Sequence, residues 1–354
     1  MKPLVKDYNR IVIKIGSSLL FSENYKLDYK FFNNITSQIA SLVKDGKEIV
    51  VVSSGAIAFG MCKLNLKERP KELYLLQAAA AIGQNELMRI YGRLSRYKVH
   101  VAQILLTWED FDDRRRYLNA KNTLLALLKL GSVSIINEND TVSTDEIKFG
   151  DNDRLSALVS SLISAEILII LSDIDGLLDK DKRVIKIVDE ITPQIKALAC
   201  PTKKITSVGG MITKIEAAKI AVDSGIPCVI ANGRRKEVIL SAIKEPQKCG
   251  TLFLPKKGCL AARKRWIAFG TKPKGKIIVD EGARNALLNK KSLLSVGVIA
   301  TEGTFELGDI VSVIDRQNCE FSRGKAGISS KQLDKVKGTR SDKEVIHCDN
   351  IVIL

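Results

Sequence analysis

Ile135-Ile136-Asn137-Glu138-Asn139-Asp140 and, shortly after it, Gly150-Asp151-Asn152-Asp153 are two polar clusters set between apolar runs. The first cluster ends an apolar, strand-like run, and the second precedes a segment that is apolar at helical spacing. Open α/β sheets bind ligands at this position, beyond the carboxyl ends of their strands. The clusters hold carboxylates and amides but no histidine or cysteine. They therefore favour an oxygen-rich site for a small charged molecule and Mg²⁺ over a zinc site.

Short apolar segments alternate with helical segments through the first two thirds of the chain. We expect strands at 10–15, 48–52, 99–106, 132–136, 167–171 and 227–231, and helices at 31–44, 73–96, 119–130, 154–164 and 211–224. This alternation predicts an α/β fold, an αβα sandwich in which helices cover both faces of a mainly parallel sheet. Because the polar loops follow strands, we expect one site along the carboxyl edge of that sheet.

The character of the sequence changes between residues 244 and 273, where prolines, glycines and the basic run Arg263-Lys264-Arg265 gather. Such a composition predicts a linker. Short alternating segments punctuated by glycines follow it, with one helical segment at 282–288. We therefore predict three parts: a first domain at 1–255, a linker at 256–275 and a small, mainly β domain at 276–354.

Length and composition limit the class of protein. The chain has 354 residues, of which 45% are apolar, and no apolar run is long enough to span a membrane. Its seven cysteines are widely spaced without a C-x-x-C pair, which is typical of a reducing cytoplasm. The net charge of +16 is spread along the chain. It is compatible with nucleic acid, with a small acidic substrate and a nucleotide, or with a lysine-rich solvated surface.

Three turns of small residues are candidates for phosphate contact. Gly16-Ser17-Ser18 and Ser53-Ser54-Gly55-Ala56 each follow an expected strand, and Gly209-Gly210 precedes an expected helix. Small residues let backbone N–H groups approach phosphate oxygens. None of the turns matches a Walker loop or G-x-G-x-x-G. Three such turns in one sheet nevertheless favour an anion site more than any one of them does.

Two lysines and the scarcity of histidine narrow the chemistry. Lys14 lies inside an apolar strand, and Lys214 lies in the first turn of a helix; both positions are unfavourable for a cation unless an anion meets it. The alternatives are an edge-strand lysine that snorkels to water and an ordinary surface lysine. The chain has only two histidines, His100 and His347, which argues against a Ser-His-Asp mechanism. Phosphoryl transfer to a carboxylate needs no general base, because that nucleophile is ionised at neutral pH.

These segments together resemble the glutamate 5-kinase family of the amino acid kinase superfamily, over residues 10–253. The carboxyl-terminal part resembles the PUA domain that many members carry. The resemblance rests on the following motifs: Lys14-Ile-Gly-Ser-Ser, Ser53-Ser-Gly-Ala-Ile-Ala, Leu105-Leu-Thr, Arg116-Tyr-Leu-Asn-Ala, Ile136-Asn-Glu-Asn-Asp, Gly150-Asp-Asn-Asp, Gly209-Gly-Met-Ile-Thr-Lys214 and Gly250-Thr-Leu-Phe.

The resemblance implies roles for individual residues. Lys14 and Lys214 would neutralise the transferring phosphoryl group, and Asp153 would hold both lysines in place. The glutamate-binding positions would be Ser54, Gly55, Asn137, Asp140 and Asn152. The ATP-binding positions would be Lys14, Gly16, Ser172, Asp173, Val208, Gly209, Gly210, Met211, Ile212, Thr213 and Lys214. Many members of the family have threonine where this chain has Val208, so a hydroxyl near the nucleotide is absent here.

The resemblance also implies partners. ATP and L-glutamate would be the substrates, Mg²⁺ would bridge the ATP phosphates without a dedicated protein ligand, and the product would be γ-glutamyl phosphate. Family members form dimers or tetramers, are inhibited by proline and pass the acyl phosphate to glutamate-5-semialdehyde dehydrogenase in the cytoplasm. RNA is a further partner that the PUA-like part suggests. Two alternatives stay open: a kinase for another small carboxylate, and an RNA-binding protein whose basic tail does the main work.

Overall fold

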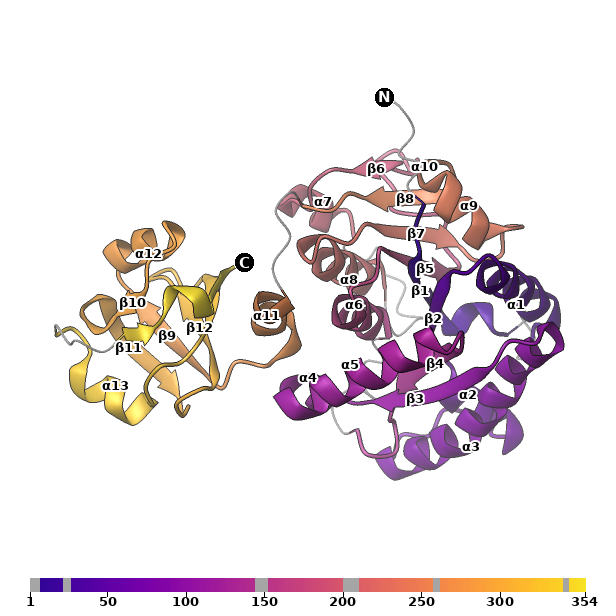
Figure 1. Cartoon of the computed structure of the whole chain (residues 1–354), viewed down its shortest axis with the longest axis horizontal. Helices are drawn as coiled ribbons and strands as arrows, with labels where there is room; N and C mark the ends of the chain where they lie inside the picture. The colour runs from indigo at the N-terminus through magenta and orange to yellow at the C-terminus, as the bar shows by residue number, and fades with distance from the viewer. Residues whose placement is uncertain (1–6, 22–26, 144–151, 200–209, 257–261, 340–343) are drawn as a thin grey trace. The chain divides into compact units, whose positions relative to one another are not determined.

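The computed structural model describes residues 7–21, 27–143, 152–199, 210–256, 262–339 and 344–354, in two compact units (Figure 1). The first unit comprises Met1–Asp110 and Arg115–Cys259, and the second comprises Phe111–Arg114 and Leu260–Leu354. The predicted linker at 256–275 contains α11 (Ala262–Arg265) and a π-helical turn, η3 (Trp266–Gly270). The boundaries 255 and 276 stay predictions, because the division falls between them.

The first unit is built on one eight-stranded sheet in the order β3-β4-β2-β1-β5-β7-β8-β6. Neighbouring strands run parallel except for β7 and β8. This confirms the predicted mainly parallel sheet. The strands are β1 (Arg10–Ile15), β2 (Glu48–Ser53), β3 (Val101–Leu106), β4 (Val133–Glu138), β5 (Ile167–Ser172), β6 (Ile187–Val188), β7 (Cys228–Asn232) and β8 (Gly250–Phe253).

Strand alternation in β1 decides which helices meet which side chains. Ile11, Ile13 and Ile15 belong to the core formed with α1 (Tyr29–Lys44), α3 (Leu73–Tyr91) and α9 (Val238–Lys244). Lys14, between Ile13 and Ile15, therefore points to the opposite face. Two neighbouring helices cover that face, α6 (Asn152–Ile163) and α8 (Met211–Asp223). Figure 1 shows α6 and α8 together on one side of β1 and β5, with α1 on the other side.

Several elements of the first unit differ from the sequence prediction. The helix expected at 73–96 ends at Tyr91 and continues as a 3₁₀ segment, η2 (Gly92–Tyr97). The composition of residues 244–273 predicted a linker, but residues 250–253 of this stretch form the buried strand β8, so the prediction was wrong there. Apolar alternation is too short there to be distinguished from a loop. The remaining elements are η1 (Ser17–Leu19), α2 (Ala56–Lys63), α4 (Trp108–Asp112), α5 (Arg114–Lys129), α7 (Pro193–Ala197) and α10 (Pro246–Cys249).

Helices α2 and α3 pack at a very short distance because glycines face each other's backbone. A Cβ atom on Gly83 of α3 would lie 1.7 Å from the carbonyl oxygen of Ala56, and one on Gly60 of α2 would lie 1.8 Å from that of Ala79. No larger side chain fits without separating the helices. This close contact holds the first residues of α2, which directly follow β2, against the rigid body of α3.

The second unit contains a five-stranded sheet in the order β11-β9-β12-β13-β15 and the pair β10-β14. Its core is formed by apolar residues that include Ile277, Val311 and Val345. The prediction of one helix was wrong, since α13 accompanies α12. The short α13 begins with a capping box between Ser329 and Gln332. The elements are β9 (Gly275–Val279), α12 (Glu281–Leu288), β10 (Leu293–Leu294), η4 (Ser295–Gly297), β11 (Val298–Gly303), β12 (Ile310–Ile314), β13 (Glu320–Lys325), α13 (Ser330–Val336), β14 (Glu344–Ile346), η5 (Cys348–Asn350) and β15 (Ile351–Ile353).

Within the described residues of both units, no helix is both long enough and apolar enough to cross a membrane.

Candidate active site

Lys14, Asp153 and Lys214 meet on the face of the sheet that α6 and α8 cover. The Asp153 carboxylate, in the first turn of α6, pairs with both lysines: Oδ1 lies 2.5 Å from Lys14 Nζ, and Oδ2 lies 3.1 Å from Lys214 Nζ. The hydroxyl of Thr213 also donates to Oδ2, at 3.0 Å. All three charged side chains are at least 94% buried. Neither lysine extends into water. The geometry therefore excludes both a snorkelling edge-strand lysine at position 14 and an ordinary surface lysine at position 214.

The charge of this cluster is fixed by its geometry. Burial on its own would raise the pKa of the Asp153 carboxyl, but the two lysines outweigh it and lower that pKa to about 2. The carboxylate is therefore ionised throughout the physiological range. Two ammonium groups and one carboxylate leave a net positive charge at the end of β1. A positive charge held in a poorly solvated place is suited to stabilising an anion that forms or moves there.

A cavity of about 170 Å³ opens beside this cluster, and loops that follow several strands surround it. Gly16 and Ser17 follow β1, Ser54 follows β2, Glu138 ends β4, and Ser172 ends β5. The cavity thus lies along the carboxyl edge of the sheet, as the sequence predicted. Its described lining consists of Lys14, Gly16, Ser17, Ser18, Ser54, Gly55, Ala56, Ile57, Ala58, Arg69, Asn137, Glu138, Asp140, Asn152, Asp153, Ser172, Asp173 and Lys214.

One side of the cavity brings together all five predicted glutamate positions: Ser54, Gly55, Asn137, Asp140 and Asn152. Gly55 has a left-handed backbone (φ 100°), and a Cβ atom there would lie 2.8 Å from Leu20 Cδ1. Asn152 Nδ2 donates to Ser53 O, Ser54 Oγ and Asn137 Oδ1 at 2.9–3.1 Å. The amide hydrogens of Asn152 are thus directed to the protein, and its buried Oδ1 atom has no hydrogen-bond partner among the described residues.

The other side contains part of the predicted ATP site. Gly16, Ser172 and Asp173 line the cavity beside the two lysines. The backbone N–H of Gly16 donates to Leu171 O at 3.0 Å, so it is not free for a phosphate oxygen as the sequence reasoning expected of this turn. Gly210, Met211, Ile212 and Thr213 do not line the cavity, although Thr213 contacts Asp153. Val208 and Gly209 lie outside the described residues.

Comparison with known proteins agrees with this geometry. Residues 9–232 match the amino acid kinase family, and residues 275–348 match the PUA domain. A protein of Thermoanaerobacter sp. (strain X514) named glutamate 5-kinase is 48% identical over 98% of both chains. The chain belongs to the glutamate 5-kinases of the amino acid kinase family. Similar proteins of the same name occur in Caldanaerobacter subterraneus subsp. tengcongensis (48% identity, 98% of both chains) and Citrifermentans bemidjiense (44% identity, 100% of both chains).

Three parts of the cavity lining were not predicted from the sequence. Arg69 comes from the loop between α2 and α3, and residues 56–58 form the first turn of α2. No motif distinguishes Arg69 from the other exposed cations of the chain. Glu138 lay inside the quoted motif, but an acid at the end of a buried strand was given no role. Its carboxylate accepts from Ser143 Oγ at 2.6 Å, across the turn that follows β4.

The expectation of Mg²⁺ can be compared with the charges of these residues. The described lining has four carboxylates (Glu138, Asp140, Asp153 and Asp173) against three cations. It is therefore not positive enough to accept the phosphates of ATP without a further cation. Asp153 is engaged by two lysines, whereas Asp173 is exposed and accepts a hydrogen bond from Ser172 Oγ. An oxygen-only donor set of this kind fits Mg²⁺ held mainly by substrate phosphates.

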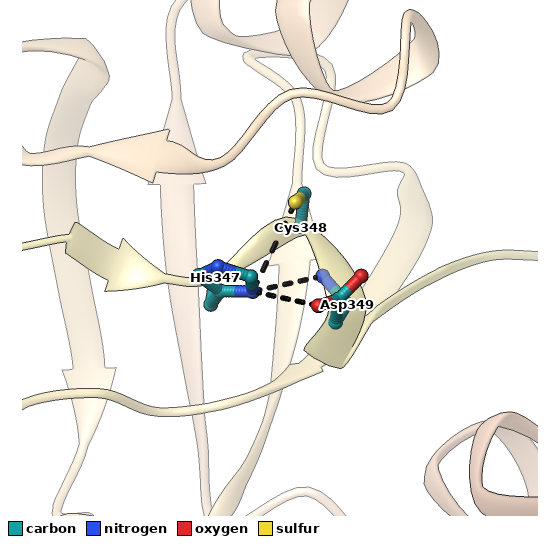
Figure 2. Close-up of side chains that lie close together, drawn as sticks. All are labelled: His347, Cys348 and Asp349. Atoms are coloured by element: carbon teal, nitrogen blue, oxygen red, sulfur yellow. Dashed lines mark hydrogen bonds and ion pairs between the residues drawn. The ribbon is translucent and has the colours of Figure 1, made fainter.

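The PUA part contains another group of possible metal ligands: His347, Cys348 and Asp349 (Figure 2). These consecutive residues lie where the chain passes from β14 to the 3₁₀ turn η5. His347 Nδ1 accepts the backbone N–H of Asp349 at 3.1 Å and so caps the turn. This hydrogen bond accounts for the arrangement without a metal ion.

Proposed function

We propose that the chain transfers the γ-phosphoryl group of ATP to the side-chain carboxylate of L-glutamate. The products would be ADP and γ-glutamyl phosphate, in the first step of proline biosynthesis. The observation that carries the proposal is the buried Lys14–Asp153–Lys214 cluster, which borders a cavity lined by all five predicted glutamate positions. The shared name of the curated relatives, at 43–48% identity, supports the same reaction.

In this mechanism the protein supplies charge and position, and no side chain acts as a base. The glutamate carboxylate is already ionised and attacks the γ-phosphorus in line with the departing ADP oxygen. Lys14 and Lys214 face the oxygens on which negative charge accumulates, and Asp153 keeps their ammonium groups in register. Mg²⁺, bound to the ATP phosphates, would contribute further charge neutralisation there. Asp173 is the carboxylate best placed to assist it through water.

Recognition of the amino acid is assigned to the side of the cavity formed by the loop after β2 and the end of β4. Asp140 would pair with the α-ammonium group. Because Asn152 donates both amide hydrogens to the protein, we assign its free Oδ1 to the same ammonium group. Asn152 is therefore assigned to the ammonium group and not to the α-carboxylate. The backbone at Gly55, ahead of α2, is the remaining candidate for that carboxylate.

The test is to trap the acyl phosphate with hydroxylamine while glutamate, aspartate and N-acetylglutamate are offered in parallel with ATP and Mg²⁺. We expect hydroxamate from glutamate at a rate at least tenfold above the other two acids. N-acetylglutamate lacks the ammonium group that Asp140 and Asn152 would receive. Preference for N-acetylglutamate or aspartate would show that the acceptor has been wrongly assigned.

RNA is a second candidate ligand, because the carboxyl-terminal part matches the PUA domain. The chain also carries a net charge of +16. Filter binding of a structured RNA across a salt series would test this. Tight binding that weakens steeply with salt would support RNA binding through phosphate contacts. Weak binding that does not change with salt concentration would argue against RNA as a ligand and leave the kinase reaction as the supported function.

The remaining partners are also proposals. The family resemblance and the absence of C-x-x-C pairs support a cytoplasmic enzyme. We propose a dimer or tetramer and transfer of the labile acyl phosphate to glutamate-5-semialdehyde dehydrogenase. Sedimentation velocity of the purified chain, with and without the dehydrogenase, would test both.

A further inference from the structure

We propose that Gln84 and Tyr91 of α3 are positioning residues for the glutamate site, and the inference rests on the function proposed above. Neither residue lines the cavity. Both are buried, and seven positions separate them, which places them on the same side of an α-helix two turns apart. Each one makes a hydrogen bond to a residue that in turn contacts Asn152.

Gln84 acts through Asn137. Asn137 Nδ2 donates to Gln84 Oε1 at 2.8 Å, and Asn137 Oδ1 accepts from Asn152 Nδ2 at 3.0 Å. An amide that donates at one end and accepts at the other has only one orientation that satisfies both neighbours. Gln84 therefore determines which way the Asn137 amide faces. That orientation presents an acceptor to Asn152 and draws its Nδ2 atom towards the protein.

Tyr91 acts through Ser53. The Tyr91 hydroxyl donates to Ser53 Oγ at 2.9 Å, and the backbone oxygen of Ser53 accepts from Asn152 Nδ2 at 3.1 Å. Ser53 is the last residue of β2, directly before the Ser54-Gly55 turn. The Tyr91 ring is fully buried and lies edge-on to Phe32. The hydroxyl is thus a fixed point to which the end of β2 is attached.

The two routes meet at Asn152 and give the same result. With Nδ2 held by Asn137, Ser53 and Ser54, the Oδ1 atom of Asn152 is left as an acceptor without a described partner in the site. A buried unpaired acceptor is costly until a donor fills it. The ammonium group of an α-amino acid supplies such a donor. Helix α3 thus sets the specificity for an amino acid without touching it.

The test compares KM for glutamate with KM for ATP in Gln84→Met and Tyr91→Phe, with Gln84→Glu and Gln194→Met as controls. Gln84→Met keeps the length of the side chain and removes the acceptor, so we expect KM for glutamate to rise at least tenfold while KM for ATP stays within twofold. Tyr91→Phe should raise KM for glutamate about threefold. Gln84→Glu keeps an acceptor oxygen and should restore KM to within about threefold of the unsubstituted value. Gln194 is an exposed residue of α7 (Pro193–Ala197) that does not line the cavity, and its substitution should change neither constant.

A second readout separates positioning from a general loss of structure. In an Asn152→Ala background, Gln84→Met should cause no further rise in KM for glutamate, because its effect passes through Asn152. Equal changes in the two KM values, or a full additional effect in that background, would overturn the inference. Gln84→Glu as impaired as Gln84→Met would do the same. An unsubstituted chain that formed no glutamyl hydroxamate would overturn the proposed function and this inference together, whereas normal turnover with unshifted KM values overturns the inference alone.

Discussion

At the scale of single residues, Asp153 determines the chemistry of the site because it joins two lysines that enter from different elements. Lys14 comes from the middle of the sheet and Lys214 from the first turn of α8. Without a carboxylate between them, two buried ammonium groups would repel each other. The ion pairs place both ammonium groups in position before ATP arrives, and preorganised charge of this kind stabilises a transition state without reorganisation.

Lys14→Ala and Lys214→Ala should each lower kcat by about 10²-fold or more, because one preorganised contact in a transition state contributes about 2.7–4 kcal/mol. KM for glutamate should change little, since the lysines face phosphate. Initial-rate kinetics at saturating ATP would measure both constants. Asp153→Asn should lower kcat similarly and combine non-additively with either lysine variant. Near-normal kcat in either alanine variant would rule out the mechanism.

Asp153 should also make stability depend on pH at the acid end. Its pKa of about 2 in the folded chain is below the ordinary aspartate value of 3.8, so its stabilising contribution is complete above about pH 5 and is lost as pH falls towards 2. The loss is on the order of 2 kcal/mol by linkage. Urea unfolding between pH 5 and pH 2.5 should show a steeper fall for the unsubstituted chain than for Asp153→Asn. Parallel curves would contradict the assigned pKa.

Asp140→Ala should raise KM for glutamate far more than KM for ATP. Removing one partner of an ion pair in a partly buried site costs roughly 3–5 kcal/mol when the other charge stays. Asp140 is half-buried, so the effect should lie towards the lower end. The same variant should narrow the preference for glutamate over glutarate, which lacks the ammonium group. An equal rise in both KM values would show that Asp140 serves the fold and not the amino acid.

At the scale of elements, the contact between α2 and α3 connects the packing of the helices to the shape of the cavity. Residues 56–58 of α2 line the cavity, and α3 carries the hydrogen bonds of Gln84 and Tyr91. The glycines at positions 60 and 83 allow the two backbones to touch. The distance between the helices is therefore fixed by the absence of side chains, and one added methyl group changes it.

Gly83→Ala should destabilise the chain by about 1–3 kcal/mol, as overpacking usually does, and should raise KM for glutamate. The added Cβ would lie 1.7 Å from Ala56 O, and backbone atoms cannot yield as a flexible side chain can. Gly92→Ala is the matched control, because a Cβ atom at that position meets nothing within 4 Å. Thermal unfolding and glutamate kinetics would compare the two. If Gly83→Ala changed neither the stability nor KM for glutamate, the close packing of α2 and α3 would not be needed for the shape of the cavity.

The elements also show how far the sequence alone could go. Strand 10–15 was predicted with its exact bounds because apolar residues surround Lys14 and a Gly-Ser-Ser turn ends it. Ser54, Gly55, Asn137, Asp140 and Asn152 could be named from the sequence because they fall in motifs that resemble the family, and the structure places them around one cavity. Gln84 could not, since a glutamine within a helix resembles any other, and only the fold reveals that it meets Asn137. Arg69 was missed for the same reason, because its place in the cavity depends on neighbours distant in sequence. The second helix α13 was missed although a local signal, the capping box of Ser329 and Gln332, marks its start.

At the scale of the whole molecule, the described residues proposed for catalysis all belong to the first unit. A chain ending at Lys256 should therefore retain kcat within about threefold. Its helical content by circular dichroism and its oligomeric state would be measured alongside. Segment Phe111–Arg114 is grouped with the second unit, so some loss of stability is expected in the shortened chain. A folded but inactive truncation would show that the PUA part contributes to the site.

The position of β1 in the sheet has a consequence for synthesis on the ribosome. β1 is made first, yet it lies between β2 and β5, so one of its edges stays unpaired until residues 167–172 have left the exit tunnel. Exposed edges of apolar strands recruit other strands, and a nascent chain is vulnerable at that stage. A charged side chain on an unpaired edge disfavours such recruitment, and Lys14, the penultimate residue of β1, provides one. We therefore expect the lysine proposed to contact phosphate to limit wrong pairing of the growing polypeptide until its carboxylate partner in α6 has been made.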